Sequence, residues 1–457
     1  MGPTLAQARP RLDRGRAAVR WGLGHALPRA AMTLAARRGD LHARLVVRSG
    51  AGGEEFWSIA EEVRRAGPLT RSRFAHVTSS HAVVREALGS PDLRSGVAVA
   101  PARGPLAHLA AWGYADAPLG PLSPPSLLVT EPPDHTRYRK LVTRVFSARA
   151  VQDLTERTRA IAERLADDLE RRARTEPTLD LVPAYCALLP VTVIAEILGV
   201  PEREREVVLR LGSAAAPSLD LGLSWSRFHA VEAALRDFER WLTHHLEQVR
   251  RAPGEDLLSQ LVAAQHDDGS GGLTDTELRS TAGLVLAAGF ETTVNLLGNG
   301  VALLAAHPEQ RELLRAQPER WPDAVEEVLR LDPPVLLTGR VAARDTVLAG
   351  VEVPAGSVIT VLLAAANRDP EVFEDPARFD VTRANAREHV SFSSGRHYCL
   401  GAALARMEGQ VGLETLTRRF PALTVESGVR RPTRILRGYD QLRVSPRAGC
   451  APEVAAR

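Results

Sequence analysis

One ten-residue segment of the chain reads Phe392-Ser393-Ser394-Gly395-Arg396-His397-Tyr398-Cys399-Leu400-Gly401. A helical pattern begins directly after it at Ala402, so we expect Cys399 on a glycine-punctuated loop that leads into a helix. A helix N-terminus has unpaired N–H groups and a partial positive charge, and both stabilise an ionised sulfur. The two glycines omit side chains where a flat, bulky group must approach the backbone. The segment therefore predicts a haem with the Cys399 thiolate as its axial ligand.

This segment resembles the haem-binding loop of the cytochromes P450. That loop has Phe, Gly, Arg or His, Cys and Gly at fixed spacings, and the matching residues are Phe392, Gly395, His397, Cys399 and Gly401. One departure is visible at Ser393, where bacterial members usually have glycine. The alternative, a structural cysteine buried in the core, would account for a lone cysteine but not for the four residue types around it.

Length and composition are those of a globular protein rich in helix-forming residues. The chain has 457 residues, 44% of them hydrophobic and 25% charged, and Ala, Leu and Arg are abundant. Length alone allows about three domains at roughly 150 residues each, but no linker or repeat divides the sequence. We therefore predict a basic N-terminal arm with an amphipathic helix at residues 1–50, one catalytic domain at 51–447 and a C-terminal tail at 448–457.

The cysteine pattern excludes several classes of site. Three cysteines occur and none forms a C-x-x-C pair, which argues against a zinc site, an iron–sulfur cluster or a disulfide framework. Cys186 is expected to pack in an apolar stretch and Cys450 to be a free thiol in the tail. Absence of a disulfide framework fits a reducing compartment, and we expect a cytoplasmic protein.

The first fifty residues contain ten arginines against Asp13 and Asp40. Such an arm could contact anionic lipid or nucleic acid. We favour the alternative, a solvated leader followed by a packed amphipathic helix, and expect no nucleic-acid partner. No apolar run reaches eighteen residues and the arm has no continuous apolar core, so neither a membrane span nor a secretory signal is predicted.

Hydrophobic periodicity predicts helices at 54–66 and 80–89 and almost continuous helix from 134 to 331. The segment 90–126 is rich in Gly, Pro and Ala without a clear period, and a loop of that length is usually functional or mobile. Short strands are expected near 73–78, and strands with intervening turns at 340–343, 346–348 and 357–363. The pattern predicts a mainly α protein with a small β-rich lobe, and this agrees with the cytochrome P450 fold that the resemblance implies.

A second motif lies inside the long apolar helix pattern and reads Ala288-Gly289-Phe290-Glu291-Thr292-Thr293. An acid beside two threonines is costly in such a helix unless the groups are used. A threonine hydroxyl can bond back to the carbonyl four residues earlier, and glycine weakens the helix locally, so we expect a loosened turn here. The alternative is a helix N-cap or a buried structural threonine pair.

The same stretch matches the oxygen-activation motif of the cytochromes P450. The resemblance implies that Ala288 and Gly289 lie against the haem, that Thr292 hydrogen-bonds the oxygen molecule, and that Glu291 helps to deliver protons. A thiolate ligand supplies electron density that favours cleavage of the O–O bond.

Four cationic or imidazole side chains match the family's contacts to the haem propionates. His135 and Arg139 are four residues apart in a predicted helix and therefore share a face. His397 lies in the cysteine loop, and Arg340 follows the long helical region. Partly buried propionates need such partners. Taken singly, each of these residues could equally be a solvated surface group.

A further charged set resembles the family's structural Glu-Arg-Arg network. Glu327 and Arg330 lie three residues apart, and Arg378 stands in the sequence Pro376-Ala377-Arg378-Phe379. Buried charges require mutual pairing, so we expect Arg378 to complete this network.

The resemblance also implies partners. No G-x-G-x-x-G motif for a flavin or nicotinamide follows a strand, so two electrons must come from outside, and a ferredoxin with its ferredoxin reductase is expected. A basic docking face for an acidic ferredoxin, or simply a solubilising surface, is predicted from Arg137, Lys140, Arg144, Arg396 and Arg406. The chain is expected to act as a monomer and to bind haem b.

The substrate is expected to be a hydrophobic organic molecule of the polyketide or macrolide, terpenoid, steroid or fatty-acid type, oxidised with O2. Its contacts are predicted from residues 90–126, 200–245, 287–288, 336–338 and 438–442. The chain is most similar to actinobacterial, mycobacterial-type members.

Three other functions compete with this prediction. A peroxide-driven or oxidative-coupling cytochrome P450 would not need the Glu291-Thr292 pair. A non-catalytic haem-binding sensor or recruitment protein predicts a damaged proton-delivery motif. A globin-like oxygen carrier would have a proximal histidine and no cysteine loop. The intact motif favours the oxygen-dependent monooxygenase.

Overall fold

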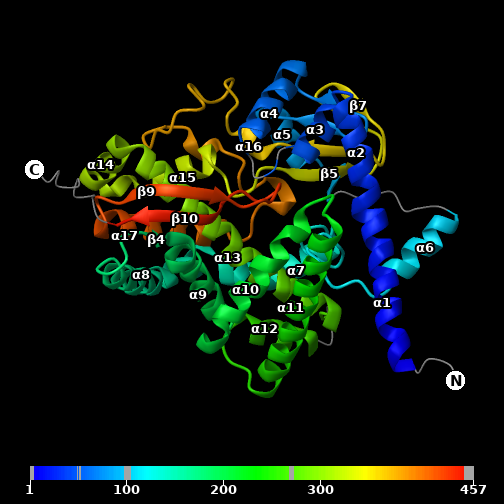
Figure 1. The fold of residues 1–457 in the computed structure, drawn as a ribbon, viewed down its shortest axis with the longest axis horizontal. Coiled ribbons are helices and arrows are strands. Elements are labelled where there is room, and N and C mark those ends of the chain that lie inside the picture. The colour runs from blue at the N-terminus through cyan, green and yellow to red at the C-terminus, as the bar shows by residue number, and fades with distance from the viewer. Residues whose placement is uncertain (1–4, 49, 51–52, 97–103, 267–271, 447–457) are drawn as a thin grey trace, which may run out of the picture.

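The computed structural model describes residues 5–48, 50, 53–96, 104–266 and 272–446. Helices dominate the described chain, and most strands gather in a small lobe at the top of Figure 1, with a second group in the middle of the molecule. The structure confirms the prediction of a mainly α protein with a small β-rich part. Among the described residues, no helix is both long enough and apolar enough to cross a bilayer.

The upper lobe is built on a five-stranded sheet. Its strand order is β1 (Thr70–Arg71), β2 (His76–Thr78), β8 (Val358–Val361), β5 (Thr338–Ala342) and β3 (Leu93–Ser95). Only β2 and β8 run parallel, and the other neighbours are antiparallel. A separate two-stranded sheet joins β6 (Thr346–Leu348) to β7 (Val351–Val353). The predicted strands at 340–343, 346–348 and 357–363 are therefore confirmed.

Two helices cover this sheet because each has one apolar face. In α4 (Glu54–Ala66) the buried residues recur with helical spacing, and they are Phe56, Ile59, Ala60 and Val63. They pack in one cluster with Val77 of β2. The helix α5 (His81–Gly89) packs against other residues of the lobe. The predictions of helices at 54–66 and 80–89 are confirmed.

The helical body surrounds α13 (Asp275–Ala306), which begins with a capping box between Thr274 and Glu277. Buried residues lie on every side of this helix, as expected for a helix inside the core. The helices around it are α9 (Leu188–Ile197), α10 (Arg205–Ala215), α11 (Trp225–Arg251), α15 (Trp321–Leu331) and α17 (Ala402–Arg419), and α8 (Ala148–Arg172) packs on α17. Helices α7 (Asp134–Thr143), α12 (Leu257–Ala263), α14 (Pro308–Ala316) and α16 (Leu363–Ala366) complete the body.

The second group of strands is a hairpin of β9 (Thr424–Arg430) and β10 (Tyr439–Ser445), with β4 (Leu179–Asp180) on the far edge of β10. The segment 431–438 joins the two long strands, and we call it the hairpin connection. An isolated bridge between Val335 and Leu436 ties this connection to the chain just before β5. The hairpin connection therefore reaches the boundary between the helical body and the upper lobe.

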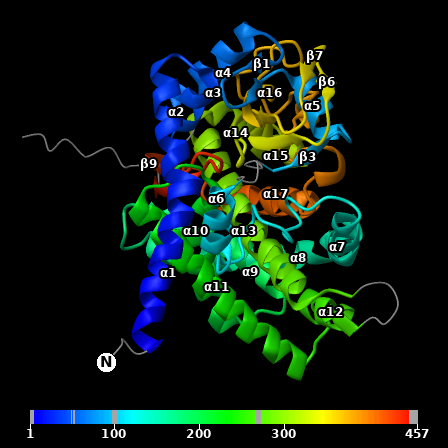
Figure 2. The same ribbon diagram turned by 90° about the vertical axis from the view of Figure 1, so that its right-hand side faces the viewer.

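The N-terminal helices lie along one side of the molecule, as Figures 1 and 2 show. They are α1 (Leu5–Trp21), the short η1 (Gly22–Ala26), α2 (Leu27–Arg37) and α3 (Leu41–Arg48). The buried Arg20 side chain donates from Nε to Glu232 Oε1 at 2.6 Å and from Nη1 to the Gly113 carbonyl at 2.6 Å. This ion pair holds α1 against α11. The boundaries at 50/51 and 447/448 stay a proposal.

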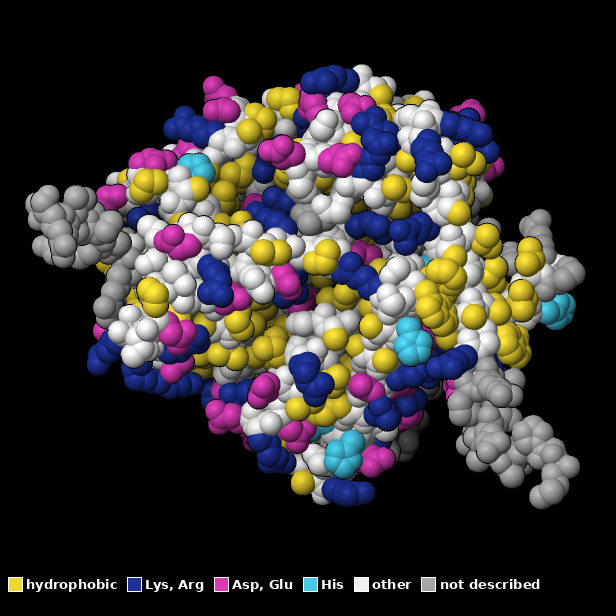
Figure 3. Space-filling model, viewed as in Figure 1, with side chains coloured by type: hydrophobic (Ala, Val, Ile, Leu, Met, Phe, Trp, Pro, Cys, Tyr) yellow, Lys and Arg dark blue, Asp and Glu magenta, His cyan; other side chains and the backbone are white. Residues whose placement is uncertain are grey.

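One helix lies where the sequence predicted a long loop. Residues Pro105–Tyr114 form α6, which packs beside α1 (Figures 1 and 2). The helix was missed because its apolar residues are not confined to one face, and Leu106, Leu109 and Trp112 remain exposed. Figure 3 shows hydrophobic side chains gathered over this side of the molecule.

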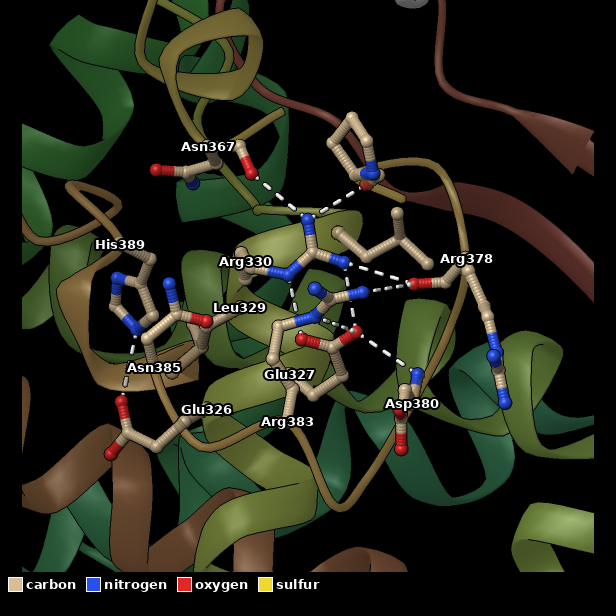
Figure 4. A network of polar contacts seen from close by, with 12 residues as sticks. Glu326, Glu327, Leu329, Arg330, Asn367, Arg378, Asp380, Arg383, Asn385 and His389 are labelled. Carbon is tan, nitrogen blue, oxygen red and sulfur yellow. Dashed lines mark hydrogen bonds and ion pairs between the residues drawn. The ribbon is translucent and has the colours of Figure 1, made fainter. Parts of the chain in front are cut away.

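A buried charge network stabilises the connection between α15 and the irregular segment that precedes the cysteine loop (Figure 4). Arg330 has a side chain with 0% exposure and donates to both carboxylate oxygens of Glu327, at 2.6 and 2.8 Å. Its remaining donors reach the carbonyls of Asn367, Pro376 and Arg378. The pairing of Glu327 with Arg330 is as predicted.

The third charged member of this network is not the predicted one. Arg383 approaches Glu327, with 3.3 Å between Nε and Oε1, whereas Arg378 is exposed and its side chain points away from the network (Figure 4). Only the carbonyl of Arg378 takes part. The reason is that the next residue, Phe379, is buried in the core, so its neighbour turns outward.

Candidate functional site

The cysteine loop is held by two backbone hydrogen bonds within the loop. The Cys399 N–H donates to the Phe392 carbonyl at 2.9 Å, and the Tyr398 N–H donates to the Gly395 carbonyl at 3.1 Å. Gly401 is the N-cap residue of α17, so the thiol stands one turn ahead of that helix, as the sequence predicted.

Close packing against the upper lobe explains one glycine of this loop. Gly395 has φ +67°, and a Cβ at this position would lie 2.7 Å from the Leu88 carbonyl oxygen of α5. Both its conformation and its surroundings therefore require glycine. Ser393 also has a positive φ, of 63°. A non-glycine residue in this region is strained, which gives a physical reason why related loops have glycine there.

Cys399 is an exposed residue, yet protein atoms surround its thiol closely. Burial raises the pKa of the thiol, while a hydrogen bond from the Gly401 backbone and the charges of Arg139 and Arg406 oppose that rise. The opposing cationic groups are the ones that would favour a thiolate.

The four residues predicted to contact propionates lie around this loop. The His135 and His397 rings are 4.5 Å apart between centroids. Arg139 donates to the Tyr398 carbonyl at 2.7 Å, and Arg340 donates weakly to Ser393 Oγ at 3.5 Å. Arg340 is buried, and burial lowers its pKa to about 10. The fold therefore brings α7, β5 and the cysteine loop together.

Glu131 is a member of this group that the sequence reasoning missed. Its carboxylate accepts from Arg396 at 2.8 Å, contacts His397 Nε2 at 3.2 Å and accepts the Ser95 N–H at 2.7 Å. Burial opposes ionisation of Glu131, but these partners outweigh it and its pKa is lowered. No signal in the sequence marks Glu131, because its partners come from β3 and from the cysteine loop.

The motif residues of α13 face a cavity, although the helix lies in the core. Ala288 is exposed and Thr292 half-buried, and Ala287, Ala288, Glu291 and Thr292 line the cavity. Thr292 Oγ1 donates to the Ala288 carbonyl at 3.2 Å, as the sequence predicted.

The expected loosened turn is not present, since α13 is continuous α-helix from Asp275 to Ala306. Gly289 serves packing instead. A Cβ on this residue would lie 2.6 Å from Ile194 Cγ1, so glycine allows α9 to approach α13 closely.

Glu291 is nearly buried and has two partners from distant parts of the chain. Ser213 of α10 donates to Glu291 Oε2 at 3.1 Å, and Arg431 of the hairpin connection forms an ion pair with Oε1. Burial lowers the pKa of Arg431. Neither partner could be expected from the motif, because both lie more than seventy positions away in the chain.

The cavity has a volume of about 720 Å³. Most predicted contact segments contribute to it, including parts of 90–126, of 200–245 and of 336–338. The segment 438–442 does not, and Arg434, Ile435 and Leu436 of the hairpin connection line the cavity instead. Residues 97–103 of the first segment lie outside the described residues.

The sequence analysis missed one wall of the cavity. N-terminal residues form it, and they are Pro28, Met32, His42, Leu45 and Val46. We predicted a packed amphipathic helix here but no role in a site. The wall forms because the N-terminal helices run along one side of the molecule, where α3 packs against α4 of the upper lobe (Figure 2).

Comparisons with known proteins agree with these features. The family model for cytochrome P450 matches residues 216–319 and 322–438. Cytochrome P450 140 of Mycobacterium tuberculosis is 48% identical over 433 residues, covering 93% of this chain and 97% of that protein. The chain belongs to the cytochrome P450 family.

Other P450s are similar over most of the chain. The 6-deoxyerythronolide B hydroxylase of Saccharopolyspora erythraea is 40% identical over 319 residues, covering 69% of this chain and 76% of that protein. The ligand-free crystal structure of CYP164A2 from Mycobacterium smegmatis has a TM-score of 0.77 at 32% identity, covering 89% of this chain and 99% of that chain. The fold and the family are those predicted from the cysteine loop.

The residues present fit the haem-thiolate cofactor that this P450 family implies. His135 is buried and its Nε2 has no hydrogen-bond partner. Arg340, Arg396 and His397 stand beside it around the single carboxylate of Glu131, so cationic and donor groups outnumber the acid. An excess of donors is what two propionates require. A Cβ on Gly401 would meet no atom within 4 Å, so there is open space at this glycine, two residues after the exposed Cys399.

Three of the five arginine and lysine residues predicted as a docking face are engaged within this P450. Arg137 pairs with Glu277 at 2.7 Å, Arg396 with Glu131 at 2.8 Å and Arg406 with Glu326 at 2.6 Å. Lys140 and Arg144 are exposed. The free positive charge of the predicted face is therefore smaller than the sequence indicated.

Proposed function

We propose that this P450 is an oxygen-dependent haem-thiolate monooxygenase acting on a hydrophobic organic molecule. The reaction would consume O2, two electrons, two protons and a substrate C–H bond, and would yield the hydroxylated product and water. The observation that carries the proposal is that one chain has both an intact Cys399 loop and, on α13, Glu291 and Thr292 on the wall of an apolar cavity.

The chain's own residues would hold haem b as follows. Cys399 Sγ would bind the haem iron, and His135, Arg139, Arg340 and His397 would contact the propionates. Packing against the ring is assigned to Phe392, Gly401 and Ala288. Gly395 and Gly289, which the sequence also predicted to lie against the haem, pack on Leu88 and Ile194 instead. When bound, the haem supplies iron for the binding and reductive cleavage of O2, and the thiolate supplies electron density.

Thr292 and Glu291 are proposed to handle the two protons. The Thr292 hydroxyl now donates to the Ala288 carbonyl, and rotation about its Cα–Cβ bond would direct the proton into the cavity. Glu291 lines the same cavity and is held by Ser213 and Arg431. A carboxylate so placed can take a proton from the side of α10 and pass it toward Thr292 through water.

An external protein is proposed to supply the electrons, a ferredoxin reduced by its ferredoxin reductase. Lys140 and Arg144 are exposed and follow Arg139, which contacts the cysteine loop, and they support an acidic docking partner. The largely apolar cavity supports a hydrophobic substrate. The relative that hydroxylates 6-deoxyerythronolide B supports hydroxylation as the reaction type.

The test is the carbon monoxide difference spectrum of the reduced protein, with a screen of hydrophobic compounds for spin-state shifts. A red-shifted Soret band is expected, and compounds that shift the spin state identify the substrate class. Cys399→Ser should abolish that band even where haem is retained. A spectrum of histidine-ligated haem in the wild type, or an unchanged band in the variant, would refute the ligand assignment.

A further inference from the structure

One end of the cavity has a concentration of positive charge that the proposed reaction does not use. Arg434 lines the cavity, and Arg29 of α2 lies close to Arg434. A Cβ on Gly222 would lie 3.5 Å from Arg29 Cβ and 3.7 Å from Arg434 Nη1, so both arginines pack around the same glycine. Arg227, in the first turn of α11, is close enough for its charge to act on Arg434. Since Arg29 is exposed, this basic cluster lies where the cavity meets the surface.

The basic cluster (Arg29, Arg227 and Arg434) faces one carboxylate. Asp220 is buried, and its oxygens accept the backbone N–H groups of Arg434 at 3.0 Å and Ile435 at 3.2 Å. Its role is therefore to hold the hairpin connection against the loop before α11. Among the residues that the structure describes, none of the three arginines forms an ion pair.

Partial burial makes the excess positive charge of these three arginines over Asp220 energetically costly. Burial lowers the pKa of Arg434, and the charges of Arg29 and Arg227 lower it further, against the opposing effect of Asp220. Arg434 Nη1 donates to the Leu221 carbonyl, which leaves guanidinium N–H groups free for a ligand. Buried charges in proteins are usually paired with an opposite charge. An anionic group on a ligand would provide that partner for the basic cluster.

The rest of the cavity has the opposite character. Its wall beside the basic cluster is apolar, with Met32, Leu45 and Val46 from the N-terminal helices, and it continues over Leu235 and Phe238 to α13. A ligand that satisfies both regions has an anionic end and an extended apolar body.

We propose that the substrate is an amphipathic carboxylate, bound with its carboxylate on the basic cluster and its apolar body directed toward Thr292. This deepens the proposed function and rests on it. Guanidinium groups bind carboxylates through paired N–H donors, so the acid would be anchored by Arg434 with Arg29 and Arg227 adding charge. Anchoring the acid at the outer end places oxidation on a carbon remote from the carboxylate.

The test compares ligands of matched chain length on the holoenzyme. Saturated fatty acids from decanoic to octadecanoic acid are titrated beside the corresponding primary alcohols and monoalkyl phosphates. Binding is measured by isothermal titration calorimetry and by the spin-state shift. We expect the best acid to bind about tenfold more tightly than its alcohol, as a charge-assisted hydrogen-bonded pair provides.

The variants assign this preference to the basic cluster. Arg434→Gln should weaken the acid about tenfold and leave the alcohol within about twofold, while Arg434→Lys should retain part of the preference. Arg227→Gln should cause a smaller loss of affinity for the acid. This variant tests the cluster if Arg434→Gln does not fold. Arg251→Gln, exposed at the other end of α11, is the matched control and should change neither ligand.

Three results would overturn the proposal. The first is equal affinity for acid and alcohol across the panel. The second is an equal loss of affinity for acid and alcohol in Arg434→Gln. The third is that only binding of the alkyl phosphates depends on the arginines, which would assign a phosphate ligand. Failure of the proposed function is a separate outcome, because it appears as the absence of the thiolate carbon monoxide band, whereas calorimetry reports carboxylate binding without turnover.

Discussion

Replacing Arg383 by methionine should destabilise the protein, whereas the same change at Arg378 should not. The Arg383 side chain is 8% exposed and contacts Glu327, whose carboxylate is 0% exposed. It also donates to the carbonyls of Glu374, Asp375 and Arg378, at 2.6, 3.2 and 3.2 Å. Methionine keeps the side-chain length but removes all of these bonds.

The magnitude follows from the burial of each partner. Loss of the buried contact to Glu327 should cost about 1.5–3 kcal/mol, as for a hydrogen bond to a charged group. The three carbonyls belong to exposed residues that water can solvate, so each adds roughly 0.5 kcal/mol. We expect a total of about 3 kcal/mol, because Arg330 still neutralises Glu327.

The assay is thermal unfolding of the holoprotein followed by circular dichroism. With an unfolding entropy of roughly 2.1 cal/mol/K per residue, about 3 kcal/mol lowers the midpoint by about 3 °C in a chain of this length. Arg378→Met should shift the midpoint by less than about 0.5 °C. A shift for Arg378→Met as large as that for Arg383→Met would refute the assignment of Arg383 to the network.

Three further predictions concern the site and its supports. Thr292→Ala should uncouple turnover, so that reductant use continues while product falls at least tenfold and peroxide rises; unchanged coupling would exclude Thr292 from proton handling. Ser393→Gly should raise the thermal midpoint by about 1 °C because it relieves a positive φ, and a fall would contradict the strain argument. Burial opposes ionisation of Glu277, but hydrogen bonds from Arg137 and Tyr138 outweigh burial and lower the pKa of Glu277 to about 2. The ionised Glu277 therefore stabilises the folded protein above about pH 4.5, the usual glutamate pKa, and this contribution is lost as the pH falls toward 2. Unfolding in urea across that range should show the difference between wild type and Glu277→Gln shrinking as the pH falls, and a constant difference would refute the linkage.

Most of what could be predicted from the sequence, including the family and the fold class, came from short local motifs. The Cys399 loop, the Glu291-Thr292 pair and the helix at 54–66 depend on neighbours within one or two turns of chain, so spacing alone identifies them. The family and the mainly α fold followed from these motifs. The departure at Ser393 was also visible, although its physical meaning needed the backbone angle.

Contacts between distant segments were decided only by the tertiary structure. Spacing could not show that Arg431 pairs with Glu291, that Glu131 joins the cysteine loop, or that Arg383 replaces Arg378. The same holds for the cavity wall from α2 and α3 and for the cluster of Arg29, Arg227 and Arg434. Periodicity specifies which face of an element is buried, whereas the partner of a buried charge depends on how elements far apart in the chain pack together.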